Sequence, residues 1–535
     1  MAVGAGHAMA GAHRADRERS RKTLGDQVRG TPDDGPAGAA PRGSGTSGLL
    51  TVDLDDWPLS LDPYHVVDFN QALVLDTLVD PLTREDGSDA APRAVPAALE
   101  SLECLDDGHT WRMRPSPDQT WDDGMPVLLA DIQAGVHRAW SPTAFVLPDT
   151  VGGPSTTPTQ DADGPVLELR SPIPLPFLPD LLAFPGAAPV RETKNGGWTA
   201  SGPYRPVRAD RDQGRIELRG KPSRRSRCHP DAPERIVFQV HTDRADAVAA
   251  FDAGELDVCF STGLDPAAFA VLAGRPEATV RPLPVACRLW VKPGIDSPLD
   301  TPEGRIEFSA GWDRGAVSDL LSGVVLPLHG YGRLWPGAPD ADRPAPYQRR
   351  ARPLRATRGA CAELALTYAD FPPNDTVARA LARDIEDRFG HRVRLRPLTF
   401  PAFAAAVAAV DYELLYCISP APFAHPASLL NPFHSATRSA RTLGFRDRAV
   451  DAALERALRM PAGDGTAEAW RDAEETVLER APVIPLFQVN SVTLRRAALP
   501  APSITSSGLV SLERMTEGPP PPTAPTPTER RAVYP

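Results

Sequence analysis

Residues 364–416, LALTYADFPPNDTVARALARDIEDRFGHRVRLRPLTFPAFAAAVAAVDYELLY, contain the pattern that decides the fold. The alternation over 364–368 predicts a strand. Apolar residues then recur at every fourth position, namely Val377, Leu381, Ile385 and Phe389, and this period predicts a helix. Asn374 or Asp375 can cap the helix, and Gly390 ends it. We then expect a strand around 393–395, a helix over 403–410 and a strand over 412–416. This spacing predicts a doubly wound α/β sheet that is buried on both faces.

The flanking sequence extends this pattern in both directions. Downstream we expect a helix capped by Asp447, a second helix over 466–479 and then a strand over 482–486. Upstream the pattern favours β-structure, with predicted strands over 216–218 and 236–240 and a short helix over 245–253. The folded part is therefore α/β.

Composition excludes several classes of protein. Hydrophobic residues make up 41% and charged residues 24% of the chain, which are ordinary values for a soluble globular protein. The 60 prolines among 535 residues disfavour a mostly helical protein, because proline removes a helix donor and clashes with the preceding turn. The net charge of −11 gives no basic surface for nucleic acid. No stretch approaches the roughly 20 apolar residues that a membrane span needs.

The two ends of the chain differ from the folded part. Residues 1–48 are rich in Gly, Ala, Arg and Asp and predict a flexible leader, and residues 516–535 contain four consecutive prolines and predict an extended tail. The leader has no apolar run after its basic residues and no cysteine for a lipid anchor. As written, the sequence therefore predicts a cytoplasmic protein.

Recognisable catalytic and metal motifs are absent from the sequence. There is no HExxH, GxSxG, phosphate loop or dinucleotide fingerprint, and no histidines pair at metal-ligand spacing. The six cysteines are scattered without a CxxC pair, so we expect free and mostly buried thiols. Asp106-Asp107-Gly108 and Asp122-Asp123-Gly124 predict hairpin turns followed by strands, rather than calcium or glycosidase carboxylates. We expect no cofactor, no metal and no catalytic residue.

Several short motifs follow one another in an order that is known from one family. They are Leu61-Asp62-Pro63, Pro96 to Glu100, Asp106 to Arg114, Trp121 to Val127, Ser201-Gly202-Pro203-Tyr204, Ala253 to Asp257, Asp313-Arg314 and Ala481 to Leu486. In this order they resemble the family 5 solute-binding proteins, the large oligopeptide-, dipeptide- and nickel-binding receptors of ABC importers.

The resemblance implies two α/β lobes that close over a ligand, with a small domain inserted in the first lobe. On this basis we expect the first lobe at 49–79, 197–285 and 480–515, the inserted satellite domain at 80–196 and the second lobe at 286–479.

The resemblance also implies a ligand site, from which this chain departs. Peptide receptors of the family hold the peptide's α-ammonium with the aspartate of a Trp-x-x-Asp-type loop. The corresponding loop here is 419–426, where Pro422 takes the place of the aspartate and no acid occurs from Tyr416 to Pro426. A buried ammonium without a counter-charge costs several kcal/mol, to an order of magnitude. We therefore expect weak binding of free dipeptides and better binding of amide-capped, aromatic or otherwise neutral molecules.

Five residues are the predicted ligand contacts, namely Asp80, Trp290, Ser419, Phe423 and His425. Asp80 stands where the family has a Glu-Gly-Leu segment, and Trp290 lies in the strand that corresponds to the family's hinge strand. Packing within the sheet is the alternative role for Trp290. Phe423 and His425 lie in a loop stiffened by prolines, which lowers the entropy lost on binding.

Two functions remain open from the sequence. The first is a monomeric solute-binding protein of a peptide importer, with a peptide-like or other small ligand, ABC permease subunits as partners, and an extracellular or membrane-associated location if it is exported. The alternative is a cytoplasmic derivative of this fold, used as an enzyme or ligand sensor in specialised metabolism. The missing export signal and the missing acid support the alternative.

Overall fold

The computed structural model describes residues 48–58, 60–63, 69–85, 93–140, 153–192, 198–199, 201–221, 232–261, 265–334, 348, 363–421, 423, 425–461, 463, 465–480, 483–499, 505 and 512. The predicted leader, apart from Gly48, and the proline-rich tail lie outside these residues, as do Pro422, Cys228 and Cys361. No helix of the described part is long and apolar enough to cross a membrane.

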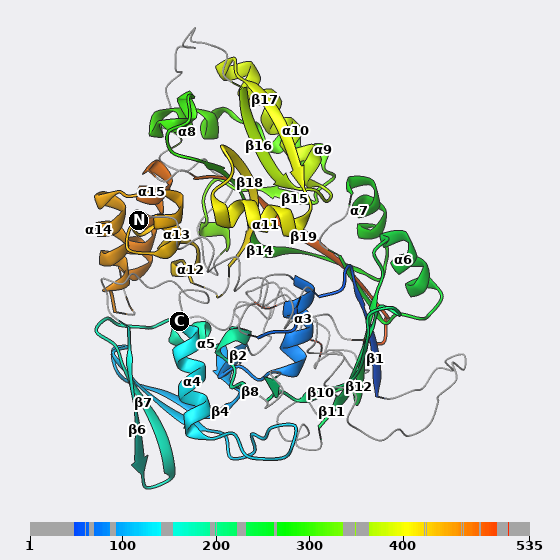
Figure 1. The fold of residues 1–535 in the computed structure, drawn as a ribbon, viewed down its shortest axis with the longest axis vertical. Helices are drawn as coiled ribbons and strands as arrows, with labels where there is room; N and C mark the ends of the chain where they lie inside the picture. Colours follow the sequence, from blue (N-terminus) through cyan, green and yellow to red (C-terminus); the bar gives the residue numbers. More distant parts are fainter. Residues whose placement is uncertain are drawn as a thin grey trace, which may run out of the picture.

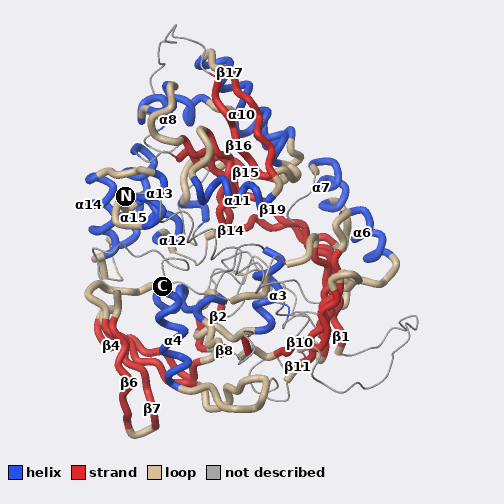
Figure 2. The backbone as a smooth tube through the Cα atoms, viewed as in Figure 1, coloured by secondary structure: helices blue, strands red, loops and turns tan. Residues whose placement is uncertain are grey.

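One 11-stranded mixed sheet runs through the molecule (Figures 1 and 2). Its strands follow the order β10-β11-β12-β1-β13-β19-β14-β18-β16-β17, and β15 pairs with β19. Their bounds are β1 Leu49–Leu54, β10 Tyr204–Asp210, β11 Arg215–Gly220, β12 Arg235–Val240, β13 Val258–Ser261, β14 Ala278–Val291, β15 Val325–Pro327, β16 Glu363–Ala369, β17 Arg392–Leu398, β18 Leu414–Pro420 and β19 Val483–Arg495.

The first lobe is built on β1, which pairs in parallel with β12 and β13. Helices α3 Phe69–Leu78, α6 Arg244–Asp252 and α7 Pro266–Ala273 pack around this part of the sheet. Val52, Ile236 and Phe238 are fully buried in its core. The predicted strands over 216–218 and 236–240 and the predicted helix over 245–253 are confirmed as β11, β12 and α6.

The second lobe contains the predicted strand and helix series. β16 runs parallel to both β17 and β18, and α10 Asn374–Phe389 and α11 Phe400–Ala409 lie between the strands along the chain. Gly390 ends α10 in the left-handed region at φ 72°, as predicted. The predicted cap of α10 is wrong, because neither Asn374 nor Asp375 caps it: the Asn374 amide donates to the Ala369 carbonyl and Asp375 accepts from Tyr368.

Further helices complete the second lobe. They are α8 Pro302–Gly311, α9 Arg314–Leu320, α12 Ala427–Leu430, α13 Arg438–Leu443, α14 Arg448–Leu458 and α15 Thr466–Arg480. Asp447 caps α14 as predicted, accepting from the backbone N–H groups of Ala449 and Val450 at 2.8 and 3.2 Å.

A separate four-stranded antiparallel sheet forms the small domain at the lower left of Figure 1. It consists of β4 Leu99–Asp106, β5 Thr110–Pro115, β6 Ser155–Asp161 and β7 Gly164–Arg170, packed with α4 Leu129–Ala139 and α5 Leu178–Leu182. Two-stranded pairs join β2 Thr83–Glu85 to β3 Ala94–Pro96 and β8 Arg191–Glu192 to β9 Trp198–Thr199. The predicted domain limits themselves stay a prediction.

The two Asp-Gly turns lead into different structures. Asp107 and Gly108 take positive φ angles of 36° and 91° between β4 and β5, which confirms the first hairpin. Gly124 also has a positive φ of 79°, yet the predicted strand after it is wrong. Only an isolated bridge between Thr120 and Pro126 forms there, and α4 begins directly afterwards. The Asp131 carboxylate accepts the Leu128 backbone N–H at 2.8 Å and so favours the helix start.

The Gly202-Pro203-Tyr204 motif fixes the return of the chain to the first lobe. The Gly202 N–H donates to the Leu78 carbonyl at 2.9 Å, and a Cβ on Gly202 would lie 2.5 Å from the Leu78 carbonyl carbon. Only glycine fits this close approach to the end of α3.

We therefore expect Gly202→Ala to lower the free energy of unfolding by about 1–3 kcal/mol, because backbone atoms at this contact must shift. Urea unfolding of the purified protein measures the change. The matched control is Gly153→Ala, where a Cβ would meet nothing within 4 Å, and which we expect to be neutral. Equal effects of the two substitutions would contradict this account of the motif.

Candidate functional site

The candidate site is one face of the sheet where β14 and β18 pair. Side chains alternate along β14, so Cys287, Leu289 and Val291 enter the second-lobe core, whereas Ala286 and Trp290 belong to clusters on the other side. The register places Ala286 opposite Ser419 and Arg288 opposite Cys417. We call Ala286, Arg288, Trp290, Cys417 and Ser419 the β14–β18 face. The structure thus brings two predicted contacts, Trp290 and Ser419, to one surface.

Trp290 is partly buried and packs against the apolar side chains on its face of the sheet. Its ring stacks on Phe433, with centroids 5.5 Å apart. Its indole Nε1 is buried and has no hydrogen-bond partner among the described residues. The ring of Trp290 is therefore packed, as the alternative role predicts. Its indole N–H, in contrast, has no acceptor among the described residues.

Arg288 lies between these residues and was not among the predicted contacts. Only 5% of it is exposed, and its guanidinium lies 5.1 Å from the Trp290 ring centroid and 5.7 Å from that of Tyr331. A cation beside aromatic faces is stabilised by their quadrupoles. The sequence contains a signal for it, since an arginine interrupts the apolar run Val285–Val291 with the same parity as Trp290.

Tyr331 is held over Arg288 by an acidic side chain from another helix. Glu474 of α15 accepts the backbone N–H groups of Tyr331 and Gly332, the latter at 3.2 Å. Burial raises the pKa of Glu474 to about 7, against the effect of these two hydrogen bonds. Burial also raises the pKa of Tyr331, a shift that neighbouring Arg288 opposes. Neither residue was predicted from the sequence.

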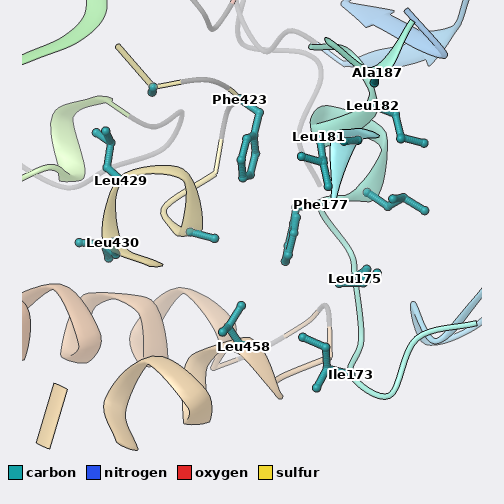
Figure 3. Packing of buried hydrophobic residues seen from close by; sticks show 14 of the residues in the cluster. Ile173, Leu175, Phe177, Leu181, Leu182, Ala187, Phe423, Leu429, Leu430 and Leu458 are labelled. Atoms are coloured by element: carbon teal, nitrogen blue, oxygen red, sulfur yellow. The ribbon is translucent and has the colours of Figure 1, made fainter. Parts of the chain in front are cut away.

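Phe423 and His425 lie in a contact between the small domain and the second lobe. Phe177, which precedes α5, stacks on Phe423 at 5.9 Å and on His425 at 4.5 Å between centroids. Figure 3 shows Phe177 and Phe423 approaching each other from these two parts of the chain. Phe423 is only 1% exposed, and one apolar cluster continues from Leu181 to Leu458. The contact holds the two parts together.

His425 is neutral in this contact. The Trp470 ring meets it edge-on at 5.0 Å, and its Nδ1 accepts the Ala427 N–H at 3.2 Å. Burial lowers the pKa of His425 to about 3, because a charged imidazole would lose its hydration there.

Asp80 follows α3, and its carboxylate is engaged by two side chains. It is 2% exposed, its carboxylate pairs with Arg84 at 2.6 Å, and it accepts the Gln119 amide at 3.1 Å. The same amide nitrogen of Gln119 donates to the Ser201 carbonyl at 2.8 Å. Asp80 therefore ties the end of α3 to the small domain and to the segment before Gly202.

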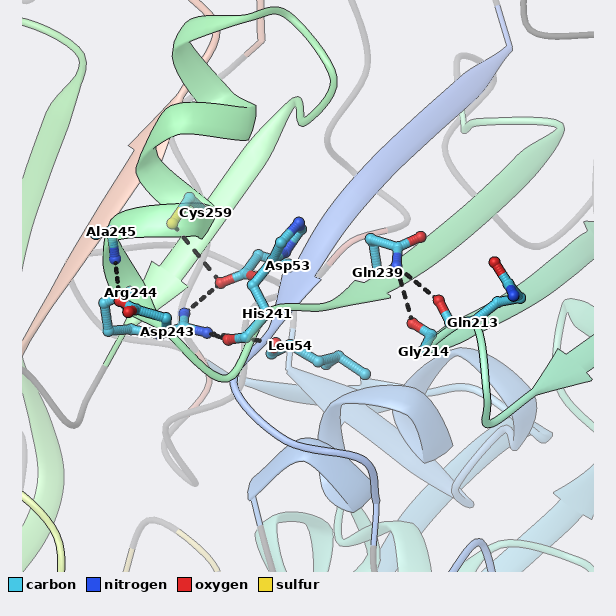
Figure 4. Close-up of polar contacts among 10 residues, drawn as sticks. All are labelled: Asp53, Leu54, Gln213, Gly214, Gln239, His241, Asp243, Arg244, Ala245 and Cys259. Atoms are coloured by element: carbon cyan, nitrogen blue, oxygen red, sulfur yellow. Dashed lines mark hydrogen bonds and ion pairs between the residues drawn. The ribbon is translucent and has the colours of Figure 1, made fainter.

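A buried polar cluster around Asp53 in the first lobe does not have the arrangement of a nucleophilic site (Figure 4). Asp53, at the end of β1, accepts from His241 Nδ1 at 2.8 Å and from Arg244, and Cys259 Sγ lies 3.7 Å from it. Burial raises the pKa of Asp53, although His241 and Arg244 oppose the rise. Burial raises the pKa of the Cys259 thiol to about 12, so no thiolate forms at neutral pH. The thiol contacts the carboxylate rather than the imidazole, and the cluster joins β1, β13 and α6.

The part of the chain that the structure describes includes four of the six cysteines. No group of three or more His, Cys, Asp or Glu side chains there could hold a metal ion. Cys104, Cys259, Cys287 and Cys417 are free, with Cys104 exposed and Cys259 and Cys287 buried.

Comparison with known proteins gives one family and many structures. The model described as "Bacterial extracellular solute-binding proteins, family 5 Middle" matches residues 93–441, more than half of the chain. No curated protein sequence matches this chain. Three similar solved structures are Haemophilus influenzae OppA in complex with RPPGFSPFR, the Escherichia coli murein tripeptide binding protein MppA, and AgaA from A. tumefaciens R10 in complex with agropinic acid.

The similarity to these structures extends over nearly their whole length. OppA is 18% identical with a TM-score of 0.70, and MppA and AgaA are each 17% identical with a TM-score of 0.72. In each case the match covers 88% of this chain and 99% of the other. At this identity the likeness establishes the fold, a two-lobed α/β architecture.

The contact of Phe177 with Phe423 generates a double-mutant prediction. We expect a coupling free energy of about 0.5–1.5 kcal/mol between Phe177→Ala and Phe423→Ala in urea unfolding, because stacked aromatic pairs contribute this much beyond burial. The control cycle combines Phe177→Ala with Phe308→Ala, which lies in the second-lobe core, and we expect it to be additive. Additive effects in the first cycle would contradict the contact.

His425 generates a pH prediction. The pKa is about 3 in the folded protein and near 6.5 in an unfolded chain, so the unfolded chain binds the proton more tightly between these values. Stability is therefore complete above about pH 6.5 and is lost as the pH falls towards 3. We expect His425→Gln to flatten the fall in unfolding free energy between pH 7 and pH 5, and exposed His137→Gln to leave it unchanged. An unaltered slope in His425→Gln would overturn the assignment.

Proposed function

Because this chain belongs to the family 5 bacterial extracellular solute-binding proteins, we propose that it is the binding component of an ABC importer, closing two lobes over a small organic ligand. One observation carries the proposal: the β14–β18 face lies in the second lobe beside a contact in which Phe177 reaches Phe423 and His425. Ligands bound at such a face are enclosed when the lobes meet and released when they part.

The ligand that we propose has no free amine. No acid occurs from Tyr416 to Pro426, and Asp80 is engaged by Arg84 and Gln119. An ammonium at this position would therefore be desolvated without a counter-charge. OppA is described with a bound peptide and AgaA with agropinic acid, so the fold is seen with more than one type of ligand.

The five predicted contacts take different parts in this proposal. Trp290 and Ser419 line the ligand on the β14–β18 face, Phe423 and His425 hold the lobes closed beside it, and Asp80 faces them from the first lobe. We expect a monomer that meets permease subunits when it is liganded, and an extracellular location where it is exported as its family is. Membership of a family of extracellular binding proteins does not favour the cytoplasmic enzyme or sensor.

A matched peptide library tests the proposal. We expect N-acetylated peptides to bind at least ten times more tightly than the same peptides with a free amine in isothermal titration calorimetry, because acetylation removes the uncompensated charge. Small-angle scattering with saturating ligand should show a smaller radius of gyration. Submicromolar binding of a free-amine peptide, lost on acetylation, would contradict the proposed ligand. Absence of binding and closure with every compound would contradict the function.

A further inference from the structure

Among the described residues of the second lobe three arginines are buried, and two of them are satisfied mainly by backbone carbonyls. Arg314 is 2% exposed, and its guanidinium donates to the carbonyls of Ser309 at 2.6 Å and Pro485 at 2.8 Å and to the Ser309 hydroxyl at 2.9 Å. Arg305 is 7% exposed and donates to the carbonyls of Leu299, Asp300 and Arg480 at 2.8–3.0 Å. Such acceptors offset the loss of hydration that a buried cation suffers.

Arg288 is as deeply buried and has none of these partners. Among the described residues, no carboxylate lies within 4.0 Å of its guanidinium and no backbone carbonyl accepts from it; the oxygen that it approaches is the Tyr331 hydroxyl, and its Nε is buried without a hydrogen-bond partner. The faces of Trp290 and Tyr331 are its neighbours. Aromatic faces compensate a cation only in part, by about 0.5–2 kcal/mol. The position is therefore costly unless another group supplies acceptors.

Polar groups on Trp290, Tyr331 and the segment that packs on Trp290 also lack acceptors among the described residues. The Trp290 indole N–H is buried without a hydrogen-bond partner among the described residues, and the buried Tyr331 hydroxyl approaches only the Arg288 guanidinium, so its own proton has no acceptor there. Asn431 is fully buried, two residues before the Phe433 ring that stacks on Trp290, and its amide nitrogen and oxygen have no partner there either. Each of these side chains can donate a hydrogen bond. The complement of such a site is an anion that is rich in acceptor oxygens.

We propose that Arg288 binds a carboxylate of the ligand, with the rings of Trp290 and Tyr331 on either side of the bound group. This inference rests on the proposed function and names the ligand class as an organic acid without a free amine, such as an N-acylated amino acid or peptide. The planar guanidinium donates two parallel hydrogen bonds to the two carboxylate oxygens, and the charge pair is strongest where water is excluded.

A first experiment needs no ligand and compares unfolding of three variants. We expect Arg288→Met to keep or raise the melting temperature, because it removes a buried cation that has no carboxylate or backbone carbonyl as partner and keeps much of the side-chain volume. Arg314→Met should lower the melting temperature by several degrees, since it leaves backbone carbonyls without donors. The exposed Arg219→Met controls for the change in net charge and should be neutral. A fall in Arg288→Met as large as in Arg314→Met would overturn the inference, because Arg288 would then be structural.

The second experiment measures binding with defined probes. The probes are N-acetyl-phenylalanine and N-acetylated tripeptides, each as the free acid and as the amide, with benzoate, benzamide and inorganic phosphate at high concentration and matched ionic strength. We expect the acids to bind wild type and Arg219→Met at least tenfold more tightly than the amides, and Arg288→Met to lose this preference. Phosphate should not stabilise the protein, since it is not planar and lacks an apolar body.

The outcomes separate the inference from the proposed function. Tight binding of any probe that is equal for acid and amide, or unaltered in Arg288→Met, overturns the inference and leaves the solute-binding function standing. Stabilisation of wild type by phosphate but by no carboxylate overturns the ligand class. If no acid, benzoate included, binds more tightly than its amide, this also counts against the inference. Closure measured with other ligands then decides the function.

Discussion

The pairing of β14 with β19 is the constraint on which the two lobes and the candidate site both depend. These strands are antiparallel neighbours over Ala278–Trp290, and β19 also carries β13 of the first lobe and β15 of the second. Their register decides which β14 side chains enter the core. A slip of one residue would turn Arg288 and Trp290 into the aliphatic core of the second lobe and turn Cys287 and Leu289 to the opposite face of the sheet. The ladder is interrupted between Pro282 and Ala286, where prolines supply no N–H.

The sequence predicts best where one local period dominates. The helix over 374–389 has apolar residues at every fourth position and a glycine at its end, so tertiary contacts need not be known. In contrast, the predicted strand over 482–486 is only the first part of β19, which continues to Arg495. Polar residues in this continuation do not fit the pattern of a buried strand, so the sequence did not predict it. They are nevertheless buried and donate hydrogen bonds to neighbouring segments: Gln488 to the Leu283 carbonyl, Asn490 to that of Gly323, and Ser491 to that of Arg281. No period in the sequence shows such long-range partners.

The candidate site could be predicted from the sequence only in part. Trp290 and Ser419 were placed through the family resemblance rather than through a local pattern, and the structure brings them to one face. The partner of Phe423 and His425 could not be, since Phe177 lies about 250 residues earlier in a different domain. Whether a buried arginine is satisfied depends on carbonyls from several segments. Sequence alone therefore could not distinguish Arg288 from Arg314.

The apolar contact around Phe177 and the buried Arg288 have opposite effects on closure of the lobes. The apolar contact favours the closed arrangement whether or not a ligand is present, because it removes aromatic surface from water. Enclosing the unpaired Arg288 opposes closure, because its hydration is lost without replacement. An anion bound at Arg288 removes only the second effect, so it binds the closed form better than the open form and shifts the equilibrium towards it. A neutral ligand of the same shape lacks this differential affinity. If Arg288 binds the ligand's carboxylate, the buried charge is therefore what makes closure depend on the ligand.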